Sequence, residues 1–453
     1  MCAPTTQVNS FNESSSKKKS TSKKGFLYGT ISLACAVTAA SVTMSHFQSR
    51  RDSLGCDAVC IGSMTSARSG LTLVGATLIG KLSDTRRFDR FGGGRKLCLM
   101  IGIMASLVEL VLSSHATSIR TLWISMVPSA LLNQNFTIMK ALFGDYHNNL
   151  DGNSSAAERA GSVGKLGMAV GLAFMVGPLA SSTFFTTYEQ AAIFAAICLL
   201  ASLAFVFLLP HPQSTSQQQQ KNRTTTNQEA EKEKLSSSIF QRFLPDFVPA
   251  ARTPAALFLM TCRVCMALAF HIFQTIWSVA LRQRFEFGPK EYGFYFSFIG
   301  FAYAMSQGFV AKFLIQKFGS SNMGRCRLLL WSSLILGGGR MIAYTTNHLA
   351  VVYGIFGLII TALGVVNTIF TADTSKIASP QELGGLFGVL SSVESLAGIA
   401  GPILGGTLTK MHPQYGPLGV VVVLYGIVFS SVYLGYERYV GGVSSVTADT
   451  EKK

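Results

Sequence analysis

The chain has 453 residues, of which 49% are apolar and only 13% are charged, whereas a soluble domain carries about 25% charged residues. This low charge excludes an ordinary large soluble enzyme and indicates a membrane protein. The net charge of +16 comes from the tails and alternate loops, without a basic domain interleaved with aromatic residues. It therefore argues against a nucleic-acid-binding protein.

The chain begins with a segment, residues 1–24, that is rich in Ser, Thr and Lys and is expected to form a disordered basic tail. Together with the apolar run after it, this segment also fits a signal peptide or, being poor in acids, a transit peptide to an organelle. We prefer an uncleaved first membrane helix, because eleven further apolar segments follow and no convincing cleavage site is present.

Apolar segments long enough to cross a bilayer, which takes about 20 residues, recur along the whole chain. We predict an all-α polytopic membrane protein with 12 transmembrane helices in two six-helix pseudo-repeats. The expected helices lie near residues 25–46, 60–82, 96–114, 121–143, 159–181, 188–210, 254–280, 291–317, 326–344, 348–373, 383–409 and 416–436. Lys and Arg concentrate in the two tails and the loops on their side, so both termini are expected in the cytoplasm.

A polar stretch at residues 211–252, with runs of Gln and Thr followed by mixed charges, divides the helices six and six. The predicted organisation is a cytoplasmic tail (1–24), an N-terminal six-helix bundle (25–210), a cytoplasmic linker (211–252), a C-terminal six-helix bundle (253–437) and a second cytoplasmic tail (438–453).

The nine cysteines show no spacing that indicates a metal site, so neither a metal nor a cofactor is expected. Cys262 and Cys265 have a CxxC spacing but lie within an apolar helix, without a second pair. Cys56 and Cys60 share a short loop expected to face outward. A disulfide between them is one reading, and two unpaired thiols is the reading favoured here.

A short basic hairpin with one acid separates the second and third expected helices. Gly80 and Asp84 are followed by Arg86 and then by Arg95 and Lys96. A loop this short does not cross the membrane, so both flanking helices open to the same side, and its positive charge marks that side as cytoplasmic.

The fifth and eleventh expected helices share a spacing of small residues and proline, displaced by 224 positions. The repeated residues are Gly164, Gly177 and Pro178 in the first copy and Gly388, Gly401 and Pro402 in the second. Small residues let helices approach closely, and proline bends a helix by removing an amide donor. Such internal duplication is typical of secondary transporters, whose binding site lies near the midplane between the repeats.

The hairpin, the Gly-Pro helix, the central linker and the six-plus-six plan resemble the major facilitator superfamily over about residues 25–436. The drug–proton antiporter branch is most similar, and within it the organic-cation-transporter-like part of solute carrier family 22. That likeness is carried by Tyr292–Gly300, Asn367–Ser375 and Gly385–Gly406. The chain departs from the branch at Met126, where an Arg is usual, and at Ser181-Ser182, where the branch has glycines.

The resemblance implies that the hairpin residues gate the cytoplasmic side, with Arg95 bridging to Asp145 and Asp84 lying at the start of the eleventh helix. It also implies a central cavity lined by the first, fourth, seventh and tenth helices. The matching polar and aromatic residues are Asn133, Gln134, His271, Gln274, Trp277 and Asn367. For His271, a packing role and a cavity role are equally weighted.

Four charges lie within the expected spans, where each is costly unless it is paired or hydrated. Glu394 and Arg263 lie at similar depth in the eleventh and seventh helices, and Glu109 and Arg68 lie in the third and second. We expect two ion pairs or water-exposed sites, one in each half. For Glu394, a proton-binding role and a structural role both remain open, whereas Glu109 is expected to be structural.

The leading hypothesis is a secondary active transporter that moves a small organic solute, cationic or amphiphilic, by alternating access, with protons as the exchanged ion. The alternative is a non-transporting receptor or regulator on the same scaffold, which the substituted Met126 keeps open. An enzyme is not expected, because HExxH, GxSxG and GxxxxGK[ST] motifs are missing from the sequence. The expected partners are a small molecule, protons and the lipid bilayer, with the chain acting as a monomer.

Overall fold

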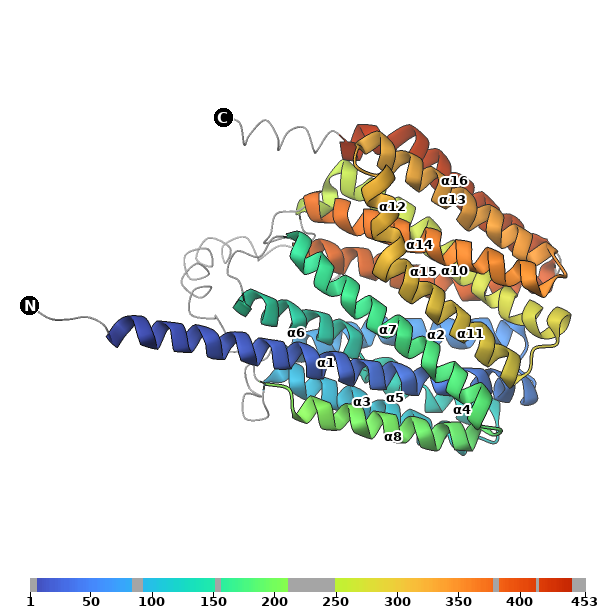
Figure 1. The fold of residues 1–453 in the computed structure, drawn as a ribbon. Coiled ribbons are helices and arrows are strands. Elements are labelled where there is room, and N and C mark those ends of the chain that lie inside the picture. Colours follow the sequence, from blue (N-terminus) through green and yellow to red (C-terminus); the bar gives the residue numbers. More distant parts are fainter. Residues whose placement is uncertain are drawn as a thin grey trace, which may run out of the picture.

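The computed structural model describes residues 6–83, 93–150, 156–210, 249–377, 383–412 and 415–441. Within these ranges the chain is helical and has no β-strand. The prediction of an all-α protein with twelve spans in two halves is confirmed, because the helices form two bodies that lie one above the other (Figure 1). The blue-to-green helices make the N-terminal half, and the yellow-to-red helices make the C-terminal half.

The N-terminal half contains six spans, the fourth of which is built from three short helices. Its helices are α1 (Thr6–Ser53), α2 (Ala58–Ser83), α3 (Gly94–Ser114), α4 (Ile119–Ser125), α5 (Val127–Leu132), α6 (Asn135–Leu150), α7 (Ala156–Phe184) and α8 (Tyr188–Phe207).

The C-terminal half also contains six spans, preceded by a short 3-10 turn. Its elements are η3 (Pro249–Arg252), α10 (Pro254–Phe285), α11 (Pro289–Met305), the π-helical turn η4 (Ser306–Val310), α12 (Ala311–Phe318), α13 (Asn322–Thr345), α14 (Leu349–Ile377), α15 (Leu383–Met411), α16 (Gly416–Tyr436) and the π-helical turn η5 (Glu437–Gly441). The eighth span therefore consists of α11, η4 and α12.

Each half has its own hydrophobic core. The buried residues of one cluster all come from α1–α8 and the segment just after α8, including Leu99, Met139 and Tyr146. Those of the other all come from α10–α16 and their connections, including Trp277 and Tyr295. Two separate cores allow each half to behave as a packed unit, since coherent bodies form around one core each.

Two kinds of face can be distinguished on the bundle. We call the side on which α1 begins and α16 ends the tail face, and the side that carries the loop between α1 and α2 the disulfide face. Between them, large apolar side chains point outward, including Phe184 and Trp331, which are 77% and 66% exposed. An exposed apolar surface this extensive indicates contact with lipid rather than with water.

Nine helical segments of the described chain are long and apolar enough to cross a membrane by length and composition. The remaining spans fall short for identifiable reasons. The fourth is divided into α4, α5 and α6, and α13 contains Arg325, Arg327 and Arg340. The α2 span contains Arg68 and ends on a polar segment. Spans of this kind are stabilised by the neighbouring helices as well as by lipid.

The first helix begins earlier than the sequence predicted. Residues 1–24 were expected to be disordered, but α1 starts at Thr6 and continues without a break to Ser53. Neither Gly nor Pro occurs between Pro4 and Gly25, so the polar segment contains no residue that stops a helix propagating outward from the membrane. At 1.5 Å per residue, the 48 residues extend for about 72 Å, which exceeds the bilayer, and α1 projects from the bundle (Figure 1).

The break in the fourth span was not predicted either. Pro128 occupies the first turn of α5, where its missing N–H costs no hydrogen bond. Asn133 then leaves the helical conformation at φ −83° and ψ 87°, and its side-chain oxygen accepts a hydrogen bond from the N–H of Asn135 at 3.3 Å. A short polar side chain that bonds to the nearby backbone in this way competes with the helix.

The cysteine prediction was wrong. Cys56 and Cys60 form a disulfide, with their Cα atoms 5.3 Å apart, within the range that a disulfide bridges. Cys56 lies in the loop after α1 and Cys60 in the first turn of α2, so the start of that helix brings the two sulfur atoms together. Oxidised pairs persist outside the cytosol.

Candidate functional site: the interface between the two halves

The repeated Gly-Pro motifs pack their own helices against equivalent neighbours. A Cβ atom on Gly177 of α7 would collide with Ser41 of α1, and one on Gly401 of α15 would lie 2.6 Å from Cβ of His271 on α10. The fifth span thus packs on the first, and the eleventh packs on the seventh. The 224-residue offset of the sequence is matched by equivalent contacts inside each half. Gly164 and Gly388 belong to the same helices, although the surroundings of Gly164 lie outside the described side chains.

The prolines of the same motifs lie where the two halves meet. The carbonyl of Pro402 approaches Gly62 of α2 so closely that a Cβ there would collide with it. The carbonyl of Pro178 would lie 2.7 Å from a Cβ on Gly293 of α11. Gly62 and Gly293 both lie in the second turn of a helix that starts on the disulfide face. Glycine is required at these positions because a backbone carbonyl fills the space.

These contacts form two seams between the halves, α2 with α15 and α7 with α11, which lie side by side in Figure 1. Further along the second seam, a Cβ on Gly300 would lie 2.5 Å from the backbone nitrogen of Met175. The hydroxyl of Ser297 donates to the carbonyl of Met175 at 2.9 Å. Seams built from small residues and few hydrogen bonds allow two rigid bodies to be joined closely without fusing their cores.

On the disulfide face, an ion pair joins the ends of α1 and α10. Nη1 of Arg282 lies 2.6 Å from Oδ1 of Asp52. The pair borders a cavity of about 280 Å³ that both halves line, with Gln48 from α1 and Gln283 from α10. Sequence reasoning missed this contact, because Asp52 and Arg282 lie at helix ends, where single charges are common.

On the tail face, most of the predicted gating hairpin lies outside what the structure describes. Asp84 and Arg86 fall in residues 84–92, and the surroundings of Gly80 in α2 and of Asp145 in α6 are likewise outside it. Their role therefore stays a prediction, as does the bridge from Arg95 to Asp145.

Lys96, another hairpin residue, lies in the first turn of α3. Its Nζ donates to the carbonyl of Phe207 at 2.8 Å and to that of Leu209 at 3.4 Å. Lysine near a helix C-terminus satisfies its last carbonyls and interacts favourably with the dipole. Lys96 therefore ties α3 to the end of α8 inside one half, instead of reaching across to the other.

The C-terminal half contains a tail-face ion pair that the sequence reasoning missed. Nη1 of Arg325, at the start of α13, lies 3.4 Å from Oδ1 of Asp373, near the end of α14. The hydroxyl of Tyr436 donates to Oδ2 of the same carboxylate at 2.7 Å. The Asp373 side chain is only 1% exposed. The sequence gives no sign of this pair, because the base and the acid come from different helices.

The polar residues expected to line a cavity divide into different environments. Asn133 is exposed and donates from Nδ2 to Oγ of Ser106 on α3 at 2.7 Å. Gln134 is buried and donates from Nε2 to the carbonyl of Thr72 on α2 at 3.1 Å. Both amides thus hold the broken fourth span against its neighbours, and only Asn133 also remains accessible.

On the seventh span, Gln274 is exposed and His271 is partly buried between α10 and α15. Asn367 of α14 is also partly buried. Trp277 is a correction to the expected set, because it is a core residue that is only 2% exposed. Its Nε1–H donates to the hydroxyl of Tyr295 at 2.8 Å, which satisfies the polar edge of the indole inside the C-terminal core.

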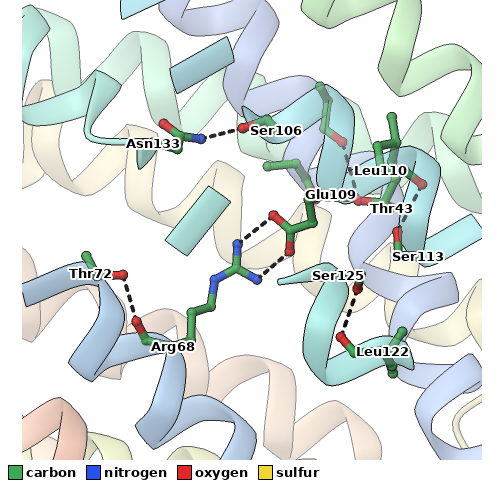
Figure 2. Close-up of polar contacts among 12 residues, drawn as sticks. Thr43, Arg68, Thr72, Ser106, Glu109, Leu110, Ser113, Leu122, Ser125 and Asn133 are labelled. Atoms are coloured by element: carbon green, nitrogen blue, oxygen red, sulfur yellow. Dashed lines mark hydrogen bonds and ion pairs between the residues drawn. The ribbon is translucent and has the colours of Figure 1, made fainter. Parts of the chain in front are cut away.

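The ion pair expected in the N-terminal half is present. Nη1 and Nη2 of Arg68 lie 3.0 and 3.2 Å from Oε1 and Oε2 of Glu109, which joins α2 to α3 (Figure 2). Asn133 and Ser106 lie one turn of α3 away in the same view. This bidentate arrangement uses both carboxylate oxygens and is the strongest geometry for such a pair.

The ion pair expected in the C-terminal half is present too. Nη1 of Arg263 on α10 lies 2.6 Å from Oε1 of Glu394 on α15. The guanidinium also lies 5.8 Å from the ring centroid of Phe370. His271 lies about two turns further along α10. Both charged side chains lie in membrane-spanning helices. Glu394 has no counterpart in the first half, because the position 224 residues earlier, in α7, is Val170.

Two six-span bodies, each with its own core and joined along small-residue seams, define the architecture of a membrane transporter. The model of the Major Facilitator Superfamily matches residues 26–402, and the chain belongs to this superfamily. The resemblance seen in the sequence is confirmed.

Individual members of the superfamily are similar to most of this chain. The chain is 24% identical over 376 residues to solute carrier family 22 member 18 of Mus musculus, covering 82% of this chain and 86% of the relative. It is 21% identical over 386 residues to the class H tetracycline resistance protein of Pasteurella multocida, covering 82% and 86%. The crystal structure of the human organic anion transporter MFSD10 superposes with a TM-score of 0.64 at 18% identity, covering 91% and 99%.

Proposed function

We propose that the protein is a secondary active transporter that moves a small organic solute across a membrane by alternating access. The observation that carries this proposal is the pair of equivalent seams between two separately cored halves. Such halves can rock against each other about a site near the midplane, which is how duplicated transporters work. Gly62 and Gly293, packed against the carbonyls of Pro402 and Pro178, are the proposed pivots of this movement.

The contacts support a conformation that is closed at the disulfide face. Asp52 and Arg282 join the halves there, and the approaches at Gly62 and Gly293 lie in the second turn from that face. Glu394, in contrast, is 40% exposed although it lies within a membrane span. A solute would reach the polar residues of α10 and α15 from the tail face in this conformation.

Two independent features support a cytoplasmic tail face. Positive charge is concentrated in the tails and the loops on that side. The Cys56–Cys60 disulfide lies on the opposite face, which is the side expected to be oxidising. Both termini are therefore proposed to lie in the cytoplasm, and the disulfide face outside the cell or in an organelle lumen.

The proposed coupling ion is the proton, and the proposed acceptor is Glu394. A carboxylate inside the membrane that is both accessible and held by a single contact can gain and lose a proton during transport. The named relatives include a tetracycline resistance protein and an organic anion transporter, and both support an organic solute. The drug–proton antiporter resemblance implies exchange of solute for protons.

The test is an uptake screen with purified protein reconstituted into liposomes, with a pH gradient imposed across the membrane. We expect accumulation of at least one organic solute that is abolished by a protonophore. A matched preparation carrying Gly300→Leu, which would obstruct the α7–α11 seam between the halves, controls for leakage. Insertion without any gradient-dependent flux over a broad panel of solutes would favour the receptor or regulator alternative.

A further inference from the structure

The two ion pairs within the spans differ in how completely they are formed. Arg68 and Glu109 use both terminal nitrogens and both oxygens. Arg263 meets Glu394 through one nitrogen and one oxygen, Nη1 and Oε1. Nε of Arg263 is buried and has no hydrogen-bond partner. Arg263 therefore retains a donor edge to which no described residue supplies an acceptor, and a buried unpaired donor is costly.

The two members of this incomplete pair also differ in accessibility. The Arg263 side chain is 16% exposed and packs over Phe370, whereas the Glu394 side chain is 40% exposed. The opposite holds for the other pair, in which Arg68 is 46% exposed and Glu109 is 17% exposed. In the C-terminal half, then, the base is held in place and the acid is the part that water and solutes can reach.

Loss of the negative charge on Glu394 would leave Arg263 as an unpaired charge, because a guanidinium stays protonated in a protein. An unpaired charge in this position is costly, and a second carboxylate would remove that cost. A proton on Glu394 and an anion on Arg263 consequently favour each other, since any such coupling acts equally in both directions.

We propose that Arg263 binds the carboxylate of an organic anion and that Glu394, which contacts Nη1 alone, neutralises the charge of Arg263 when the carrier is empty. The anion's two oxygens pair with the Nε and Nη edge of Arg263, which matches carboxylate geometry. His271 and Gln274, which lie along the same face of α10, provide further polar contacts for the body of the solute. The inference rests on the proposed transport function and names its substrate class.

This assignment has a consequence for coupling. The proton on Glu394 and the anion on Arg263 are bound in the same state of the carrier and so move in the same direction. The residues thus predict co-transport of proton and anion, which departs from the exchange that the resemblance implies.

The charged and titratable groups around Glu394 are few in the described elements that pack against α15. Most of them already have partners within the structure. They include Arg263, His271, Cys262 and Cys265 of α10, Arg68 of α2 with Glu109, Asp373 of α14 with Arg325, Tyr425 of α16 with Arg340, and Arg252 of η3. His271 lies on the same helix as Arg263, so a His271→Gln background tests whether this imidazole contributes to the effect.

The experiment measures binding to purified protein in detergent by ligand-induced thermal stabilisation. The probes are benzoate, its neutral analogue benzamide, and the cation tetraethylammonium. Glu394→Gln imitates the protonated acid and is expected to bind benzoate at least about tenfold more tightly than the unmodified chain at neutral pH. The affinity of Glu394→Gln for benzamide and for tetraethylammonium should be no higher than that of the unmodified chain. Adding Arg263→Gln should remove the gain in benzoate affinity. The matched control is Glu109→Gln, whose benzoate affinity should change by less than about twofold because Arg68 is already hydrated.

Two results would overturn the inference: no gain in benzoate affinity for Glu394→Gln, or a gain that survives removal of Arg263. If Glu394→Gln does not fold, Arg263→Gln alone decides, because it should remove the benzoate binding of the otherwise unmodified chain. An unchanged affinity would refute it equally. Binding without flux would refute the transport function alone, and flux of cations without benzoate binding would refute only the anion site.

Discussion

The ion pair between Asp52 and Arg282 gives a direct prediction about how the disulfide face opens. Asp52→Asn removes the charge but keeps the size of the side chain, so the seams at Gly62 and Gly293 stay unchanged. Because the pair joins the two halves, its loss should raise the population in which this face is open.

The size of the effect follows from the surroundings of the pair. The side chains are 17% and 43% exposed, so water screens their 2.6 Å contact. Ion pairs in such positions contribute about 0.2–1 kcal/mol. This corresponds to an increase of about 1.4-fold to about fivefold in the ratio of open to closed molecules. A much larger effect would mean that the pair, and not the seams, holds the face closed.

The assay measures how fast a membrane-impermeant maleimide modifies a cysteine introduced at Ser278, which lines the cavity beneath the pair. Asp52→Asn should increase this rate within the stated range, and the charge exchange Asp52→Arg with Arg282→Asp should restore it. Asp57→Asn is the matched control, since Asp57 borders the same cavity but accepts from the N–H of Cys60 at 2.8 Å within one half. An unchanged rate in Asp52→Asn, or an equal rise in Asp57→Asn, would refute the reasoning.

Three further predictions concern stability and can be checked by unfolding titrations in detergent. Gly401→Val should destabilise the protein by about 1–3 kcal/mol through overpacking against α10. Gly354 has open space around it, so Gly354→Val should destabilise the protein by less than about 1 kcal/mol. An equal loss of stability in the two variants would contradict this. Asp373→Ala leaves Arg325 and a buried hydroxyl without their acceptor and should cost about 3 kcal/mol. Trp277→Phe removes one buried hydrogen bond and should destabilise the protein by about 1–2 kcal/mol without altering solute affinity. A selective loss of solute binding would instead indicate that Trp277 lines the cavity.

The twelve spans and their duplication could be predicted from the sequence because both depend on simple periodic signals. Apolar segments of bilayer length mark the helices, and the motif around Gly177 and Gly401 repeats at one fixed offset. The pairing of Arg263 with Glu394 was also foreseeable, because a charge within the membrane needs a partner at similar depth.

Features that depend on contacts between distant segments could not be predicted in the same way. Asp373 is one acid near a helix end, and only the packing of α13, α14 and α16 shows that Arg325 and Tyr436 converge on it. Trp277 is a residue type that often lines a cavity, but only its hydrogen bond to Tyr295 shows that its side chain points into the core. For Cys56 and Cys60 the sequence favoured unpaired thiols, because spacing alone does not show that the first turn of α2 brings the two sulfur atoms together.

The most direct test of alternating access is to measure distances between the two halves on both faces of the same protein. Spin labels at Ser53 and Gln283 report on the disulfide face, and labels at Leu208 and Ser320 report on the tail side of the bundle. We predict two populations of distances for each pair, with the first pair moving apart as the second closes when pH or solute is changed. A single unchanging distance for each pair, in reconstituted protein that binds solute, would contradict the movement of two rigid halves.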